Sequence, residues 1–226
     1  ELLKSKGITV CVYEDTEDPP KPDACYCCNW DTFHEDGTAI LYPMRSVTRR
    51  PERRKDVIEM LEKEHGFKIK ALHDLSPAEE EGKFLEGAGS MVFDHVNKIV
   101  YASISPRTHK ELVEKVGKIL GYKVITWKSV DDQERDIYHA NVIMSIGEKW
   151  AILCEESIPD EKERETVRKS LEETDHEVIT VTLKQVYDYA ANSYEAINNK
   201  GERFFVISER GYKSLTKEQI QTFEKY

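Results

Sequence analysis

The chain has 226 residues, a formal net charge of -10, and 34% charged residues that are spread along its length. This acidic balance excludes a nucleic-acid or anionic-membrane partner held by a basic patch. No apolar run approaches the roughly 18 residues that a membrane span needs, and the length suffices for a sizeable core.

The chain has five cysteines, Cys11, Cys25, Cys27, Cys28 and Cys154. An odd count in a chain of this size argues against a disulfide scaffold, so a reducing, cytoplasmic setting is expected. The three cysteines of the run "ACYCCN" (Cys25, Cys27 and Cys28), with His34, make four potential metal ligands. Their C-x-C-C spacing, however, differs from the C-x2-C spacing of zinc sites. We therefore expect no metal and interpret these cysteines as small apolar residues at the end of a strand.

The predicted elements begin with the end of a helix that Gly7 stops, followed by a strand over Ile8–Tyr13 and a Pro-rich acidic loop. A unit of two strands, a helix and one more strand then recurs. Its helices are predicted over Glu52–His65, from Arg107 to Leu120, from Asp160 to Glu173 and from Thr216, where "TKEQ" is a capping box.

The helix starts at Arg107, Asp160 and Thr216 are 53 and 56 residues apart. A period of this length predicts a propeller-like ring of ββαβ units; the alternative is a chance alternation of strands and helices in an ordinary α/β domain. Closing a ring would need a hairpin before Glu1 and a strand after Tyr226. We therefore expect residues 1–226 to be a single α/β propeller domain that lacks its first hairpin and last strand.

Polar residues stand where these units begin. His139 and Asn141 precede the apolar segment Val142–Ile146, and on a strand two such residues point to the same side. Glu86, followed by Gly87 and Gly89, holds the corresponding place one unit earlier, and Asn29 begins an earlier unit. Because equivalent strand ends meet near the axis of a pseudo-symmetric ring, these four residues could face one central cavity; alternatively, each is an ordinary polar residue at a strand end.

Taken together, the motifs resemble the guanidine-modifying superfamily of arginine deiminases, dimethylarginine hydrolases and amidinotransferases, and most of all its citrulline-hydrolysing branch. The resemblance rests on five segments in the expected order between Pro22 and Gly201: "KPDACYCCNW…HEDGTAILYPM…RRPERR", "FLEGAGSMVFD", "YASISPRT", "YHANVIMSIG" and "YAANSYEAINNKG". It implies a five-bladed α/β propeller of ββαβ units.

The resemblance also implies roles for individual residues. Glu86 and His139 match the catalytic acid and histidine, and Asn29 and Asn141 stand where deiminases carry aspartates that hold the guanidinium. Arg107, in "SPRT", matches an arginine that binds the substrate carboxylate. Two departures are clear: the Gly-rich motif with the nucleophilic cysteine is absent, and Cys27-Cys28 replaces the usual Pro-Asn.

The implied chemistry is hydrolysis of a C–N bond through a covalent cysteine intermediate, with the cysteine outside this chain and no cofactor. The substrate is expected to be a small ureido or guanidino amino acid. An amide side chain offers both a donor and an acceptor, so Asn29 and Asn141 favour neutral citrulline over the arginine cation. A non-catalytic binding or interaction propeller, and an amidinotransferase that uses an amine in place of water, stay open as alternatives.

Overall fold

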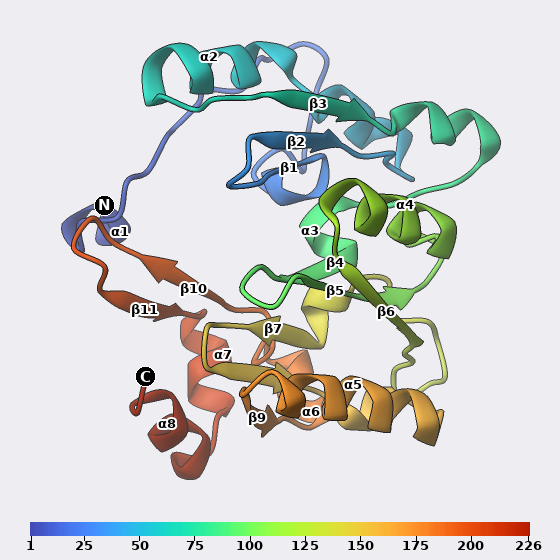
Figure 1. Ribbon diagram of the computed structural model, residues 1–226, viewed down its shortest axis with the longest axis vertical. Helices are drawn as coiled ribbons and strands as arrows, with labels where there is room; N and C mark the ends of the chain where they lie inside the picture. Colours follow the sequence, from blue (N-terminus) through green and yellow to red (C-terminus); the bar gives the residue numbers. More distant parts are fainter.

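The computed structural model describes all 226 residues and places them in four small sheets (Figure 1). Three sheets repeat one pattern: an antiparallel hairpin whose second strand pairs in parallel with a third strand. These sheets are β1 (Asp31–Phe33), β2 (Thr38–Leu41) and β3 (Ala71–Asp74); β4 (Met91–Asp94), β5 (Ile99–Ile104) and β6 (Lys123–Lys128); and β7 (Met144–Ile146), β8 (Trp150–Leu153) and β9 (Glu177–Thr180). The fourth is the hairpin of β10 (Tyr194–Ile197) and β11 (Arg203–Val206).

A helix precedes the third strand of each three-stranded sheet, so the predicted ββαβ unit is confirmed three times. These helices are α2 (Lys55–His65), α4 (Lys110–Leu120) and α5 (Glu161–Glu173), and the shorter helices are α1 (Leu2–Ser5), α3 (Gly87–Ser90), α6 (Leu183–Tyr187), α7 (Glu209–Ser214) and α8 (Lys217–Phe223). The 3₁₀ helices are η1 (Cys27–Asn29), η2 (Val47–Glu52), η3 (Ser76–Glu81), η4 (Ala140–Val142) and η5 (Glu155–Ser157).

Local sequence signals explain where the helices begin and end. Asp160 caps α5 by accepting a hydrogen bond from the backbone N–H of Glu163, and Thr216 forms the predicted capping box with Gln219 at the start of α8. At the other end of α4, Gly121 takes a left-handed conformation with φ of 69°, which glycine adopts at no steric cost. The sequence therefore predicted these helix ends.

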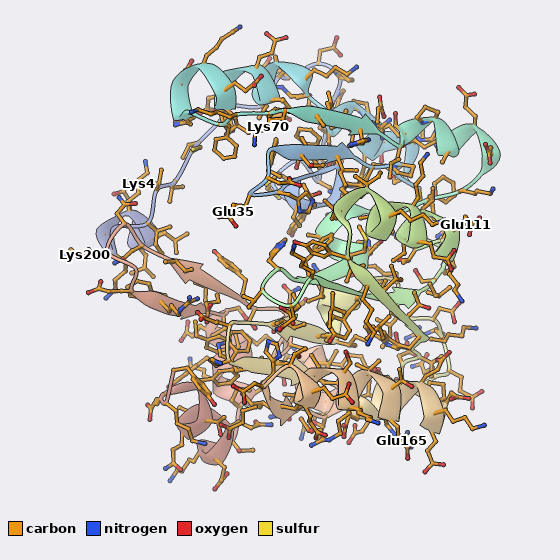
Figure 2. All side chains as sticks on the ribbon, viewed as in Figure 1. Lys4, Glu35, Lys70, Glu111, Glu165 and Lys200 are labelled. Carbon is orange, nitrogen blue, oxygen red and sulfur yellow. The ribbon has the colours of Figure 1, made fainter.

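The units succeed one another along the molecule, with α2 at the top of Figure 1 and α5 at the bottom. The first strands are neighbours, because β4 lies against β7 and β7 lies against β10. Buried side chains of β5, β6, β8 and α5 form the largest apolar core, and a second core lies between β2, β5 and α4. Charged side chains such as Glu111 and Glu165 project outward from α4 and α5 (Figure 2).

Several predicted features are wrong in detail. Ile8–Tyr13 is not a strand, because this segment pairs with no other strand. The residues just before it are held at the turn of the β10–β11 hairpin, where Asn198 Nδ2 donates to the Lys6 carbonyl and the Asn199 N–H donates to the Gly7 carbonyl. The helices predicted from Glu52 and Arg107 begin at Lys55 and Lys110. The α/β class and the repeat are confirmed; four small sheets are present without a closed barrel, and the five-bladed propeller stays a prediction. No helix is both long and apolar enough to cross a membrane.

Candidate active site

Three short helical turns meet at the centre of the chain, and each turn comes directly before the first strand of its unit. They are η1 before β1, α3 before β4 and η4 before β7, and α3 contacts both of the others. Asn29 ends η1, Glu86 is the N-cap of α3, and His139 is the N-cap of η4. These turns bring an amide, a carboxyl group and an imidazole together, with Asn29 at the end of its turn and Glu86 and His139 at the starts of theirs.

Glu86 and His139 form the centre of this cluster. The Glu86 Oε2 atom lies 2.7 Å from His139 Nε2, and the two residues are 0% and 6% exposed. The other carboxylate oxygen of Glu86, Oε1, accepts a hydrogen bond of 3.0 Å from the backbone N–H of Arg45. A buried acid–imidazole pair of this kind is a candidate for proton transfer.

The surroundings favour one protonation state of the pair. Burial would raise the pKa of Glu86, but hydrogen bonding and charge from His139, together with Arg107 and the Arg45 amide, hold that pKa below its ordinary value. Burial also lowers the pKa of His139, and the Glu86 carboxylate opposes that shift. An ionised carboxylate only accepts, so Nε2 of a neutral His139 carries the proton and Nδ1 is left with a free lone pair.

Two glycines in "LEGAGS" let the three turns approach so closely. A Cβ atom on Gly89 would lie 2.3 Å from Asn29 Nδ2 and 2.8 Å from His139 Nδ1. Gly87 has φ of 42°, and a Cβ atom there would lie 2.5 Å from the Cys28 carbonyl oxygen. Any larger residue at Gly89 would therefore push apart the amide and the imidazole.

Arg107 lies beside the pair, in the turn between β5 and α4. Its Nη1 atom is 3.2 Å from Glu86 Oε2, and its guanidinium stacks over the ring of Tyr138 at 5.1 Å from the centroid. The side chain is 31% exposed and has no other side-chain hydrogen bond, so part of its donor fork faces solvent. This is the geometry of an arginine that could receive an anionic group.

A set of buried hydroxyl groups holds these residues in place. Ser90 Oγ accepts from the backbone N–H of Glu86 at 2.9 Å and donates to the Arg107 carbonyl at 3.0 Å. Ser105 Oγ donates to the Tyr138 carbonyl at 2.8 Å and accepts from the Arg107 N–H at 3.1 Å. The two serines thus connect the backbones of the segments that carry the acid, the guanidinium and the imidazole. No motif in the sequence indicated this support.

The structure corrects the prediction for Asn141. His139 and Asn141 do not share the face of a strand, because η4 runs over Ala140–Val142 and β7 begins only at Met144. The Asn141 carbonyl accepts a hydrogen bond of 3.0 Å from Asn192 Nδ2, and its side chain bonds to neither Glu86 nor His139. Of the predicted site residues, Asn29, Glu86, Arg107 and His139 form one connected cluster.

The cysteines also differ from their interpretation as residues at a strand end. Cys25, Cys27 and Cys28 are exposed and lie in and before η1, and no group of three or more side chains could hold a metal ion. Although these residues are exposed as a whole, partial desolvation of the sulfur atoms raises the pKa of the Cys27 and Cys28 thiols, and burial raises that of Cys154 to about 11. No cysteine hydrogen bonds with His139, so none of the five is arranged as an activated nucleophile.

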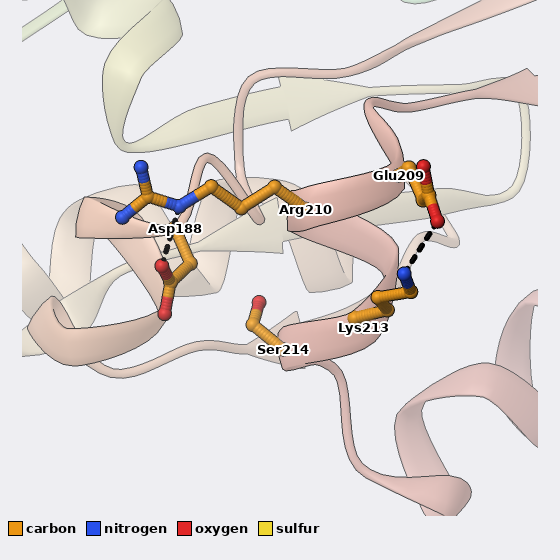
Figure 3. A pocket seen from close by; sticks show the side chains of 5 residues that line it. All are labelled: Asp188, Glu209, Arg210, Lys213 and Ser214. Carbon is orange, nitrogen blue, oxygen red and sulfur yellow. Dashed lines mark hydrogen bonds and ion pairs between the residues drawn. The ribbon is translucent and has the colours of Figure 1, made fainter.

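Other hollows carry less chemistry. One of about 350 Å³ is lined by Asp188, Glu209, Arg210, Lys213 and Ser214 (Figure 3). Arg210 Nε bonds Asp188 at 2.7 Å and Lys213 bonds Glu209, so its charges are paired with each other at the surface. None of its residues belongs to the Glu86–His139 cluster, and such exposed pairs contribute little energy.

The family model and the structural neighbours described next place the chain in the guanidine-modifying amidinotransferase superfamily. A family model described as "N,N dimethylarginine dimethylhydrolase, eukaryotic" matches residues 1–226, and the chain belongs to this family. The superfamily prediction is thereby confirmed. No curated protein sequence matches the chain.

Solved structures agree on the fold. The N-terminal domain of ArgZ, a cyanobacterial arginine dihydrolase, bound to substrate, has a TM-score of 0.64 and 15% identity over 91% of this chain and 66% of that one. A dimethylarginine dimethylaminohydrolase in adduct with S-methyl-L-thiocitrulline has a TM-score of 0.59 and 15% identity over 90% of this chain and 67% of that one. The chain thus spans about two thirds of these relatives, and less than a quarter of the longer AgrE, solved with ornithine and NAD+.

Proposed function

We propose that this protein is a hydrolase that cleaves a C–N bond of a ureido or guanidino amino acid, with citrulline favoured. The observation that carries the proposal is the buried 2.7 Å contact between Glu86 Oε2 and His139 Nε2, which leaves His139 Nδ1 free beside Asn29. A shielded imidazole with one free nitrogen is suited to moving a proton at neutral pH.

The proposed reaction has two covalent steps. The thiol of a cysteine outside these 226 residues gives its proton to Nδ1 of neutral His139 and attacks the trigonal carbon, and His139 passes that proton to the departing nitrogen as the C–N bond breaks. His139 then takes a proton from water, which attacks the carbon bound to sulfur, and returns this proton to the cysteine as the C–S bond breaks. Support comes from the ArgZ domain, a variant of which was solved covalently bound to a reaction intermediate.

Glu86 and Arg107 bind different ends of the substrate in this proposal. The Glu86 carboxylate accepts hydrogen bonds from substrate N–H groups and offsets the positive charge that develops as His139 is protonated. Arg107, which uses one nitrogen to contact Glu86 and is 31% exposed, anchors the α-carboxylate. Asn29 and Asn141 are proposed to contact the ureido group, although only Asn29 lies in the hydrogen-bonded cluster.

The proposal includes the setting of the reaction. We propose that the units are part of one five-bladed propeller domain, that the protein acts in the cytoplasm, and that its partner is a small amino acid. The reaction as written needs no cofactor.

A direct experiment separates the alternatives. The complete natural protein is incubated with citrulline, arginine and dimethylarginine, and the released amines, ammonia, ornithine and citrulline are quantified. We expect citrulline to be consumed fastest, and a mass-spectrometric adduct on one cysteine under acid quench. Preference for arginine or dimethylarginine would refute the citrulline assignment. Binding without turnover would point to a non-catalytic module, and turnover only with an added amine to an amidinotransferase.

A further inference from the structure

A buried ion pair lies directly behind Asn29, in η2. Arg49 donates from Nε to Glu52 Oε1 at 2.9 Å and from Nη2 to Glu52 Oε2 at 2.8 Å. Arg49 is 6% exposed and Glu52 is 3% exposed. This fork-to-fork geometry fixes the guanidinium in one plane, so its remaining N–H groups point in set directions.

One of those directions leads to Asn29. The Arg49 Nη1 atom lies 3.2 Å from Asn29 Oδ1, and Nη2 also donates to the Tyr26 carbonyl at 3.1 Å, three residues before Asn29. A guanidinium has donors and no acceptor, so the atom of the amide that faces Arg49 must be oxygen. The chemistry of the pair therefore decides which way the Asn29 amide is turned.

The Asn29 amide nitrogen consequently lies on the side of the acid and the imidazole. Nδ2 is 3.4 Å from the Glu86 carbonyl oxygen, and it shares with His139 Nδ1 the space left by the missing Cβ of Gly89. Turning the amide over would place its N–H groups against the N–H groups of Arg49 and leave buried donors unpaired, which is unfavourable. The group that Asn29 presents on the side of Glu86 and His139 is thus a donor.

We infer that Arg49, held by Glu52, is a positioning residue that sets substrate specificity by orienting Asn29. A ureido group has a carbonyl oxygen that can accept from Asn29 Nδ2, whereas every nitrogen of a guanidinium is a donor and meets this N–H with no acceptor. The inference rests on the proposed function and deepens it. It assigns the preference for a ureido over a guanidino substrate to an ion pair that touches neither.

The first variant replaces the hydrogen-bond donor that faces Glu86 and His139 with an acceptor. Asn29→Asp keeps an oxygen for Arg49 and replaces the N–H donor with a second oxygen, which accepts from a guanidinium. We expect the ratio of kcat/KM for citrulline to that for arginine to fall at least tenfold, because a site built around a hydrogen-bond partner rejects the substrate that lacks it. An unchanged ratio would overturn the inference.

The second pair of variants changes the orienting group and leaves Asn29 in place. Arg49→Met with Glu52→Met removes both charges together, so neither is left buried alone, and the amide is free to turn. We expect the citrulline-to-arginine ratio to fall about tenfold through a rise in KM for citrulline. Arg49→Lys retains one donor and should restore part of the ratio, and it carries the test if the double variant fails to fold.

A matched control is available in the same region. Arg53 Nη1 lies 2.5 Å from Glu79 Oε1 in another shielded arginine–glutamate cluster, which Arg50 Nε joins at 3.0 Å from Glu79 Oε2, and Arg53 makes no contact with Asn29. Arg53→Met with Glu79→Met should lower the melting temperature by a similar amount and leave the ratio unchanged. An equal change of ratio in this control would show that loosening of the fold is the cause, and would overturn the inference.

The two proposals fail differently. Turnover of neither citrulline nor arginine by the natural protein contradicts the proposed function, and calorimetric affinities for the two amino acids then provide the ratio. Turnover of citrulline with a ratio that no Arg49 or Asn29 variant alters leaves the proposed function standing and removes the role of Arg49.

Discussion

The molecule contains two buried acid–histidine pairs, and they differ in how many of their hydrogen-bonding groups already have a partner. Glu86 and His139 contact each other at 2.7 Å, and Asp94 and His176 lie 3.9 Å apart; in each pair both residues are at most 6% exposed. His176 is saturated, since Nδ1 bonds Thr174 Oγ1 and Nε2 bonds the Gly147 carbonyl. His139 instead keeps Nδ1 free.

The two acids differ in which parts of the chain donate hydrogen bonds to them. Asp94 accepts from the backbone N–H and the side-chain amide of Asn97, and so closes the β4–β5 turn. Glu86 accepts from groups that belong to three separate segments, at Arg45, Arg107 and His139. Burial of an acid–histidine pair is therefore no sign of chemistry by itself; unused hydrogen-bonding capacity beside a space is the better sign.

Substituting the two histidines gives the largest expected contrast. His139→Gln should lower kcat/KM of the complete protein about 10³-fold, as expected for loss of general acid–base catalysis. His176→Gln should leave kcat/KM nearly unchanged and lower the free energy of unfolding by about 1–3 kcal/mol through unpaired buried groups. Steady-state kinetics and thermal melts measure both. A loss of activity in folded His176→Gln would erase the distinction between the pairs.

Gly89→Ala tests whether spacing within the first pair matters. The added Cβ would overlap Asn29 Nδ2 and His139 Nδ1, so we expect about a 10²-fold loss of kcat with a folded protein. Gly121→Ala is the control, because its Cβ would meet no atom within 4 Å and only φ of 69° is strained, at a cost of about 1 kcal/mol. Equal kinetic losses in both would show that backbone strain, and not the site, is responsible.

Arg107→Met separates binding from chemistry at the first pair. Loss of the proposed carboxylate anchor should raise KM about tenfold or more, with a smaller change in kcat. A substrate analogue without the α-carboxylate should be processed equally by both proteins. If kcat falls and KM stays constant, Arg107 acts on Glu86 alone and does not hold the carboxylate.

The smallest expected effect is a change in acid stability away from both pairs. Burial lowers the pKa of His34 to about 4, and its ring lies between Phe93, His95 and Thr32. The unfolded chain binds this proton near pH 6.5, so stability is complete above that pH and is lost as the pH falls toward 4. His34→Gln should flatten the fall in urea midpoint between pH 6.5 and 4. An unaltered slope would assign the acid loss to other groups.

Much of the site could be predicted before any coordinates. The repeated unit, the α5 and α8 caps, and the proximity of Asn29, Glu86 and His139 follow from periodicity and from polar residues where units begin, whereas Arg107 was indicated only by the family resemblance. The prediction that His139 and Asn141 share one face of a strand was wrong because it treated "YHANV" as a strand with period two, whereas the backbone turns there through a 3₁₀ helix. The run "RRPERR" was visible in the sequence, and nothing in it distinguished Arg49 from its neighbours.

The sequence by itself determined the order of strands and helices, the places where polar residues interrupt them, and the superfamily. The first two are local properties, set by side-chain period, capping and glycine, and the superfamily was indicated by the resemblance of short motifs. Only the tertiary structure decided which nitrogen of His139 is free, which arginine faces Asn29 and which of two acid–histidine pairs is saturated. The first two outcomes depend on contacts between residues 53 and 20 positions apart, and hydrogen-bond geometry there is fixed by packing of whole turns against one another.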